Sequence, residues 1–194
     1  MMATSDPDPG TRQTRNAERT RHAILTAAAE AMAHKGTALS IAEVAASAGV
    51  SKSGLLHHFG SRDQLLIAVV DDANERFRAA VMTHLDLSEN HPGKVLRAYV
   101  RALCGGSEET AQFFASAPMW NGVLEIPGIA DVIAADAEWW ATQLSSDGMD
   151  ADRIMVVRRA AEGIAAAAAF GEETPERVLA GRDILLGMCS ADQD

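Results

Sequence analysis

A stretch of 27 residues, 40–66, carries the pattern that most restricts how this chain can fold. Ser40 followed by Glu43 is a capping box, in which each side chain satisfies a backbone N–H of the first helical turn. Gly49 then supplies a position that tolerates positive φ, and Ser51 supplies a fresh N-cap for a second short helix. Two short helices joined by a tight glycine turn make a helix-turn-helix.

The second helix of this motif is predicted over residues 52–58, with Leu55 and Phe59 on its inward side. Its outward face is then available to the major groove of DNA. The residues expected on that outward face are Lys52, Ser53, Gly54, His57 and His58. The motif therefore predicts a chain that reads DNA.

The same residues carry a resemblance to a known family. Residues 44–65 read VAxxAGVSKxxLxxHFxSRDxL, where x marks an open position. This run is similar to the N-terminal domain of TetR/AcrR-type transcriptional regulators, and the resemblance covers roughly residues 11–70. It implies family DNA contacts at His58 and at Arg62, where the family usually has Lys. One position departs, because the family usually has a phosphate-contacting Tyr where this chain has Leu56.

The expected DNA-contacting set combines the outward face, the caps, two N-terminal arginines and the contacts that the resemblance implies. Its members are Arg15, Arg19, Ser40, Ser51, Lys52, Ser53, Gly54, His57, His58 and Arg62. The formal net charge is −10, yet residues 1–62 hold seven Lys and Arg against five Asp and Glu, and residues 63–194 hold ten against 22. Positive charge therefore lies where phosphates would be met, although the acidic excess could also serve solubility.

Helical periodicity and scarce β-branched runs predict an all-α fold of about nine helices. Residues 1–12 are expected to form a disordered tail, 13–60 a three-helix helix-turn-helix domain, and 61–194 a helical bundle for ligand binding and dimerisation. A long helix over 61–87 would link the two domains. The other helices are predicted near 16–34, 93–105, 107–117, 128–146, 150–170 and 174–189.

The last two predicted helices are rich in small and aliphatic side chains, including five consecutive alanines after Ile164. Paired with their copies about a two-fold axis, such helices would form a four-helix dimer interface. The pattern alone fits an intrachain core equally well, because alanine is a good helix former. The resemblance favours the interface, since family members usually dimerise through their last two helices. The expected interface residues are Val157, Ala161, Ile164, Ala165, Ala168, Val178, Leu185 and Leu186.

Large side chains gather in residues 113–140, a window that holds all three tryptophans. Ligand cavities in helical domains are usually apolar and aromatic, so this window predicts a small-molecule effector pocket beside the long helix. Each of these residues could also be ordinary core, and the sequence does not choose between an acidic and a basic effector. The expected lining residues are Phe77, Tyr99, Phe113, Phe114, Met119, Trp120 and Trp139.

Several kinds of site are not expected. The sequence has no Gly-rich phosphate loop, no G-x-S-x-G, no H-E-x-x-H and no C-x-x-C, so we expect no enzyme, no catalytic residues, no metal and no cofactor. The first residues lack the apolar segment of a secretory signal, and the longest apolar run, 163–170, is too short to cross a bilayer. A cytoplasmic protein without membrane contact is expected.

Three functions fit these observations. The first is the function that the resemblance implies, a homodimeric DNA-binding transcriptional regulator, most often a repressor. It would bind a pseudo-palindromic operator in double-stranded DNA and leave it when a small-molecule effector binds. The second is a small-molecule-binding or enzymatic helical bundle with a vestigial DNA head. The third is a DNA-binding protein without an effector.

Overall fold

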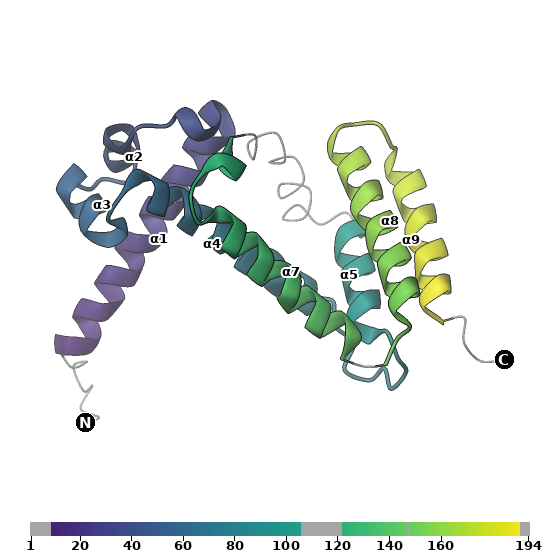
Figure 1. Cartoon of the computed structure of the whole chain (residues 1–194). Helices are drawn as coiled ribbons and strands as arrows, with labels where there is room; N and C mark the ends of the chain where they lie inside the picture. Colours follow the sequence, from purple (N-terminus) through teal and green to yellow (C-terminus); the bar gives the residue numbers. More distant parts are fainter. Residues whose placement is uncertain (1–8, 106–121, 147, 191–194) are drawn as a thin grey trace, which may run out of the picture. The chain divides into compact units, whose positions relative to one another are not determined.

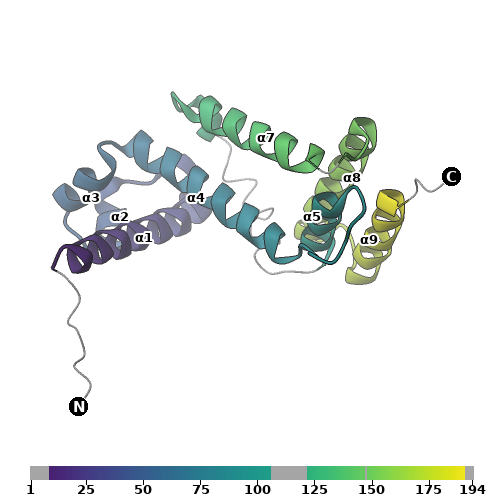
Figure 2. The ribbon, with the colours of Figure 1, turned by 90° about the horizontal axis from the view of Figure 1, so that it is seen from below.

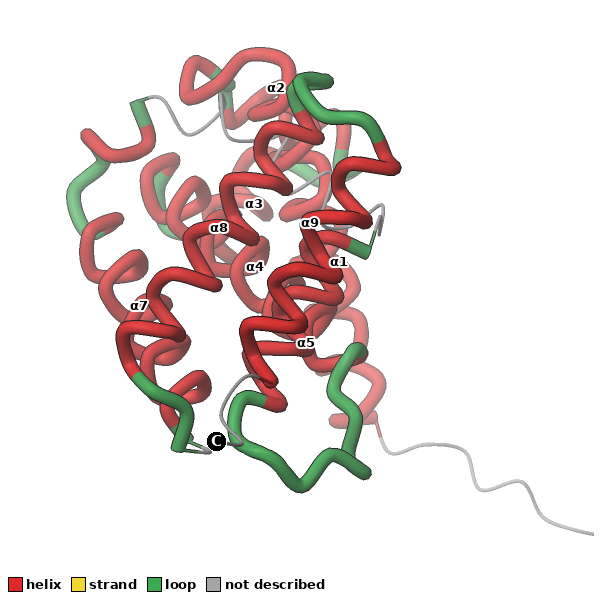
Figure 3. Tube along the Cα trace, turned by 90° about the vertical axis from the view of Figure 1, so that its right-hand side faces the viewer, coloured by secondary structure: helices red, strands yellow, loops and turns green. Residues whose placement is uncertain are grey.

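The computed structural model describes residues 9–105, 122–146 and 148–190, and within these ranges every regular element is helical (Figure 1). The described residues form eight α-helices and two short 3₁₀ helices. Figure 3 shows them as helices joined by loops, without a strand along the described trace. The predicted all-α fold is confirmed, while the predicted helix 107–117 lies outside the described residues.

The first of two compact units holds the described residues up to Val70 together with 122–127. Apolar side chains from its helices are buried together, and the most deeply buried are Ile24, Ala28, Met32, Leu55, Leu65 and Leu66. The elements of this unit are α1 (Pro9–Lys35), η1 (Gly36–Ala38), α2 (Ile41–Ser47), α3 (Lys52–Phe59), the start of α4 (Arg62–Thr83) and η3 (Val123–Glu125).

The first helix begins earlier than the sequence pattern predicts. α1 starts at Pro9, so residues 9–12 of the segment expected to be disordered are helical. Proline suits a first helical turn, because its fixed φ is already helical and its missing N–H is not needed there. Gly36 follows the helix with φ of 57°, the left-handed conformation that commonly ends a helix.

The second unit holds the described residues 71–105 and 128–190. Its central helix is α5 (Lys94–Cys104), in which nine of 11 residues are buried. Figures 1 and 2 show α8 (Ala151–Ala169) and α9 (Pro175–Ser190) beside α5. The helix α7 (Ile129–Ser145) packs against α5 and α8. Four of the predicted helices are therefore present, each within a few residues of its expected limits.

A buried ion network fixes the segment before α5. Arg97 is only 6% exposed, and its Nε donates to Glu89 Oε2 at 2.6 Å while a second nitrogen donates to the Pro92 carbonyl at 2.8 Å. Arg101 donates to the other oxygen of Glu89 at 2.5 Å. One carboxylate thus pairs with two guanidinium groups, of which that of Arg97 is the more deeply buried.

The limit between the two compact units falls within α4, between Val70 and Asp71, in the helix that was predicted to link the two domains. The helix ends at Thr83, before the predicted Leu87, and the Thr83 hydroxyl donates to the Ala80 carbonyl at 2.7 Å. None of the helices in the described ranges has the length and apolar character needed to cross a membrane.

Candidate nucleic-acid interface

The turn between α2 and α3 sets the direction of α3. Gly49 has φ of 68°, a left-handed conformation that costs glycine little. The Val50 N–H donates to the Ala45 carbonyl at 2.9 Å, which closes the turn onto α2. The Ser51 hydroxyl accepts from the Gly54 N–H at 3.0 Å and caps α3. The predicted turn and cap are both confirmed.

The helix α3 separates a buried face from an exposed one. Leu55 and Phe59 are buried, as predicted, and Lys52, Ser53 and His57 are exposed. We call these last three residues the α3 polar face. An ammonium group, a hydroxyl and an imidazole can all donate hydrogen bonds to base edges or phosphates.

The predicted serine contacts also hold the local backbone. The Ser40 hydroxyl accepts from the Glu43 N–H at 3.2 Å, and Glu43 Oε2 accepts from the Ser40 N–H at 3.4 Å. Hydrogen bonds from the Lys35 side chain and from Ser40 hold the pKa of the Glu43 carboxyl below its usual range. The Ser51 and Ser53 hydroxyls lie 3.1 Å apart. These three serines therefore order the motif before any DNA is present.

Two contacts implied by the resemblance lie partly against the protein. His58 is half-buried, and its ring lies 6.3 Å from that of Phe59. The Arg62 Nε donates to the Leu39 carbonyl at 3.2 Å, and another of its nitrogens lies 3.4 Å from Asp63. Arg62 thus ties the start of α4 to the segment before α2. Within the described ranges, no three His, Cys, Asp or Glu side chains lie where they could share a metal ion.

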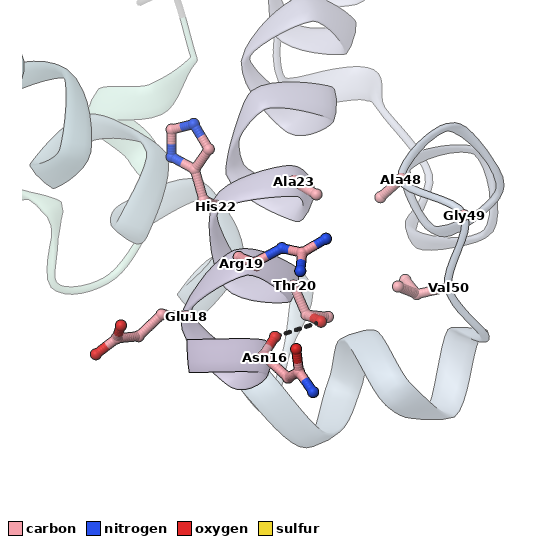
Figure 4. A pocket seen from close by; sticks show the side chains of 9 residues that line it. All are labelled: Asn16, Glu18, Arg19, Thr20, His22, Ala23, Ala48, Gly49 and Val50. Carbon is pink, nitrogen blue, oxygen red and sulfur yellow. Dashed lines mark hydrogen bonds between the residues drawn. The ribbon is translucent and has the colours of Figure 1, made fainter. Parts of the chain in front are cut away.

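A groove of about 730 Å³ lies between α1 and the turn before α3 (Figure 4). Gly49 and Val50 lie on the turn side, and the Thr20 hydroxyl on the α1 side donates to the Asn16 carbonyl at 2.9 Å. The α1 residues that line the groove are Asn16, Glu18, Arg19, Thr20, His22 and Ala23. The predicted Arg19 is therefore in the groove, whereas the exposed Arg15 is not among its lining residues. Among the α1 lining residues, Asn16, Arg19, Thr20 and Ala23 have the three- and four-residue spacing of one helix face, although only Arg19 was predicted.

In the second unit, three aromatic rings pack together in the core. The ring centres of Phe77 and Tyr99 are 5.8 Å apart, those of Tyr99 and Trp140 4.9 Å, and those of Phe77 and Trp140 5.6 Å. All three side chains are buried. Phe77 and Tyr99 were expected to line an effector pocket, and the structure places them in mutual contact. The other expected lining residues Phe113, Phe114, Met119 and Trp120 lie outside the described residues.

Trp139, the last of the expected lining residues, is half-buried beside this cluster. The guanidinium of Arg78, on α4, lies 4.7 Å from the centre of a Trp139 ring. Arg78 also donates to Asp136 Oδ1 at 2.7 Å. A cation–π contact and an ion pair therefore join α4 to α7 within the second unit.

A polar cluster missed by the sequence pattern adjoins the aromatic rings. The Tyr99 hydroxyl donates to Glu162 Oε1 at 2.8 Å, and Arg158 and Arg159 donate to the same carboxylate at 2.9 and 2.6 Å. Burial would raise the pKa of Glu162, but these three donors outweigh it and hold the pKa below its usual range. Burial and the Glu162 carboxylate raise the pKa of Tyr99, so its hydroxyl keeps the proton that it donates.

The structure places the predicted dimer-interface residues in or against the core of their own chain. Five of them are buried in the core of their own chain, namely Val157, Ala161, Ala165, Val178 and Leu185. Ile164, Ala168 and Leu186 are half-buried against the same core. The exposed large apolar side chains of α8, of its C-cap Phe170 and of α9 are Met155, Val156, Phe170, Leu179, Ile184 and Met188. We call these six residues the α8/α9 apolar face.

Several solved structures share this fold. A TetR-family transcriptional regulator from Rhodococcus sp. is 22% identical, with a TM-score of 0.70 and coverage of 88% of this chain and 97% of that one. A TetR-family member from Streptomyces coelicolor A3 is 25% identical, with a TM-score of 0.68 and coverage of 88% and 98%. The multidrug binding protein EbrR, complexed with imidazole, is 25% identical, with a TM-score of 0.63 and coverage of 97% and 100%. EbrR complexes with malachite green and with ethidium are also similar.

Family models cover both halves of the chain, although a search of curated protein sequences found no match. The model described as "Bacterial regulatory proteins, tetR family" matches residues 24–69, which include the helix-turn-helix. The model described as "Tetracyclin repressor-like, C-terminal domain" matches residues 93–188. With the capped helix-turn-helix and the helical second unit, these matches show that the chain belongs to the TetR family of transcriptional regulators.

Proposed function

We propose that this chain is a homodimeric cytoplasmic repressor that binds a pseudo-palindromic operator and leaves it when a small-molecule effector binds. The observation that carries the DNA-binding part is the α3 polar face, exposed on a helix whose start is fixed by the Ser51 cap. Arg15 and Arg19 are exposed on α1 and add cations suited to phosphates.

The α8/α9 apolar face supports the dimer. It supplies six of the nine large apolar side chains that are exposed among the described residues. Large apolar side chains that are exposed on neighbouring helices are typical of a protein interface. Two copies joined by a two-fold axis would present two α3 helices, which is why the operator should be pseudo-palindromic.

The aromatic cluster and its neighbours support the effector part. Phe77 and Arg78 lie on α4 and contact Trp140 and Trp139 of α7, so a ligand that displaces these rings would act on α4 directly. EbrR, which has a similar fold, has been crystallised with malachite green and ethidium, so an aromatic effector is the class to test first. Because coupling is reciprocal, an effector that lowers operator affinity must bind the operator-free protein more tightly by the same factor.

The DNA-binding proposal is tested with duplexes selected from a random pool by the full-length protein. Lys52→Ala should lower affinity for the selected duplex, and Arg19→Ala should weaken binding to all duplexes alike. Loss of one phosphate contact makes the negative slope of log affinity against log salt shallower by about one unit. Arg177→Ala, an exposed arginine of α9, is the matched control and should change neither quantity. Unchanged affinity and slope for both Lys52→Ala and Arg19→Ala would remove the proposed binding surface.

The effector proposal is tested with malachite green as the probe. The dye should quench tryptophan fluorescence and release the operator from the wild-type protein. Trp139→Ala should bind the operator normally and resist release, because the ring between Arg78 and the aromatic cluster is gone. A dye that acted on the DNA itself would release both proteins equally. Quenching without any change in operator affinity would contradict the proposed coupling.

A further inference from the structure

One side chain on the outward side of α3 has no polar group to offer DNA. Leu56 is half-exposed, and it follows Lys52 by four residues and Ser53 by three, so it lies between them one turn further along the helix. An isobutyl group cannot donate to a phosphate or to a polar base edge. If the Leu56 side chain contacts DNA, the group that it contacts must therefore be apolar.

The hydroxyl groups near Leu56 belong to Ser51 and Ser53, and both make hydrogen bonds within the motif. The Ser53 and Ser51 hydroxyls lie 3.1 Å apart, and that of Ser51 also accepts from the Gly54 N–H. The Ser53 hydroxyl therefore already has a partner within the motif, and Leu56 lies one helical turn beyond Ser53 and Lys52. Gly54 carries no side chain, and a Cβ there would lie 3.1 Å from the Ser51 Oγ.

The major groove offers one apolar feature, the methyl group on C5 of thymine. 5-Methylcytosine carries the same group at the same position. We propose that Leu56 is a specificity-determining residue that packs against a pyrimidine C5-methyl group in each half of the operator. This proposal rests on the proposed DNA-binding function and adds the chemical group that α3 reads.

The test replaces each thymine of the selected duplex by deoxyuridine, which lacks only the methyl group. One thymine in each half-site should respond, with affinity falling about fourfold for one lost methyl contact and about 15-fold when both half-sites are changed. A second comparison asks whether 5-methylcytosine can supply the methyl group in place of thymine. The responding base pair is replaced by a pair of guanine with either 5-methylcytosine or cytosine, and each native cytosine is also methylated in turn. This scan uses the wild-type protein, so it does not depend on a folded variant.

Two variants assign the effect to Leu56. Leu56→Ala should remove the difference between thymine and deoxyuridine, and Leu56→Met, which stays apolar, should keep it. Leu87→Ala removes an equally large side chain that is 80% exposed on the second unit and should also keep it. Thermal unfolding of each variant checks that the fold is retained.

The outcomes separate this inference from the function on which it rests. The inference is overturned if no methyl group affects affinity, or if Leu56→Ala keeps the full penalty, while a selected duplex is still bound tightly. In that case DNA binding stands and Leu56 does not read the methyl group. If the wild-type protein selects no duplex at all, the proposed function itself fails, and this inference fails with it.

Discussion

The replacement Ile184→Ala tests the proposed dimer at the side chain with the largest exposed fraction available for burial in the interface. Ile184 is the most exposed residue of the α8/α9 apolar face, at 66%. Full burial of an isoleucine side chain is worth about 1.5–3 kcal/mol, so covering the exposed two thirds is worth about 1–2 kcal/mol. A two-fold axis buries the residue in both copies, which gives about 2–4 kcal/mol and a dimer about 30- to 900-fold weaker.

Sedimentation over a dilution series measures this change in the dimer dissociation constant. The variant should unfold at the wild-type temperature when both are monomeric, because Ile184 contributes little to the core of its own chain. Leu124→Ala is the matched control, since Leu124 is 71% exposed in the first unit and should leave the dimer intact. Equal dissociation constants for Ile184→Ala and Leu124→Ala would show that the dimer does not use the α8/α9 apolar face.

Two further predictions concern buried carboxylates. Tyr99→Phe should lower the free energy of unfolding by about 1.5–3 kcal/mol, since it removes a hydrogen bond to a charged group, and urea unfolding should show a smaller effect in a Glu162→Gln background. Burial alone would raise the pKa of Glu89, but its two arginine partners outweigh burial and hold the pKa below its usual range. The unfolded chain then binds more protons, so this stabilisation is complete above the unfolded pKa of about 4.3 and is lost as pH falls through the lower, folded pKa. Urea unfolding between about pH 5 and pH 3 should show a shallower loss of stability for Glu89→Gln; an unchanged slope would contradict this reasoning.

The helix-turn-helix could be predicted from the sequence because its determinants are local. A capping box spans four residues, from Ser40 to Glu43, and the turn needs only Gly49 and the Ser51 cap. Each of these hydrogen bonds forms between residues three positions apart, so no knowledge of the rest of the fold is needed.

The face of the last two helices could not be assigned in the same way. Val157, Ala161 and Ala165 recur every four residues and are buried, but Met155 and Val156 are also apolar and lie on the exposed side. When a helix is apolar on two sides, periodicity locates the helix but does not tell which side faces the chain's own core. The Glu162 cluster was out of reach for another reason, because its tyrosine donor lies 63 residues away in sequence.

The helix α4 shows why the limit between the two compact units is hard to read from the sequence. Its apolar positions run from Leu65 to Val81 without a break, yet Leu65 belongs to the first unit, and Phe77 and Val81 join the core of the second. A cap marks where a helix begins, but it does not indicate into which unit's core the apolar side chains of each helical turn pack. Because a continuous ladder of backbone hydrogen bonds resists bending, α4 is a physical link between the turn that carries Phe77 and the turns that carry Leu65. The same helix would therefore carry the proposed coupling between effector and operator.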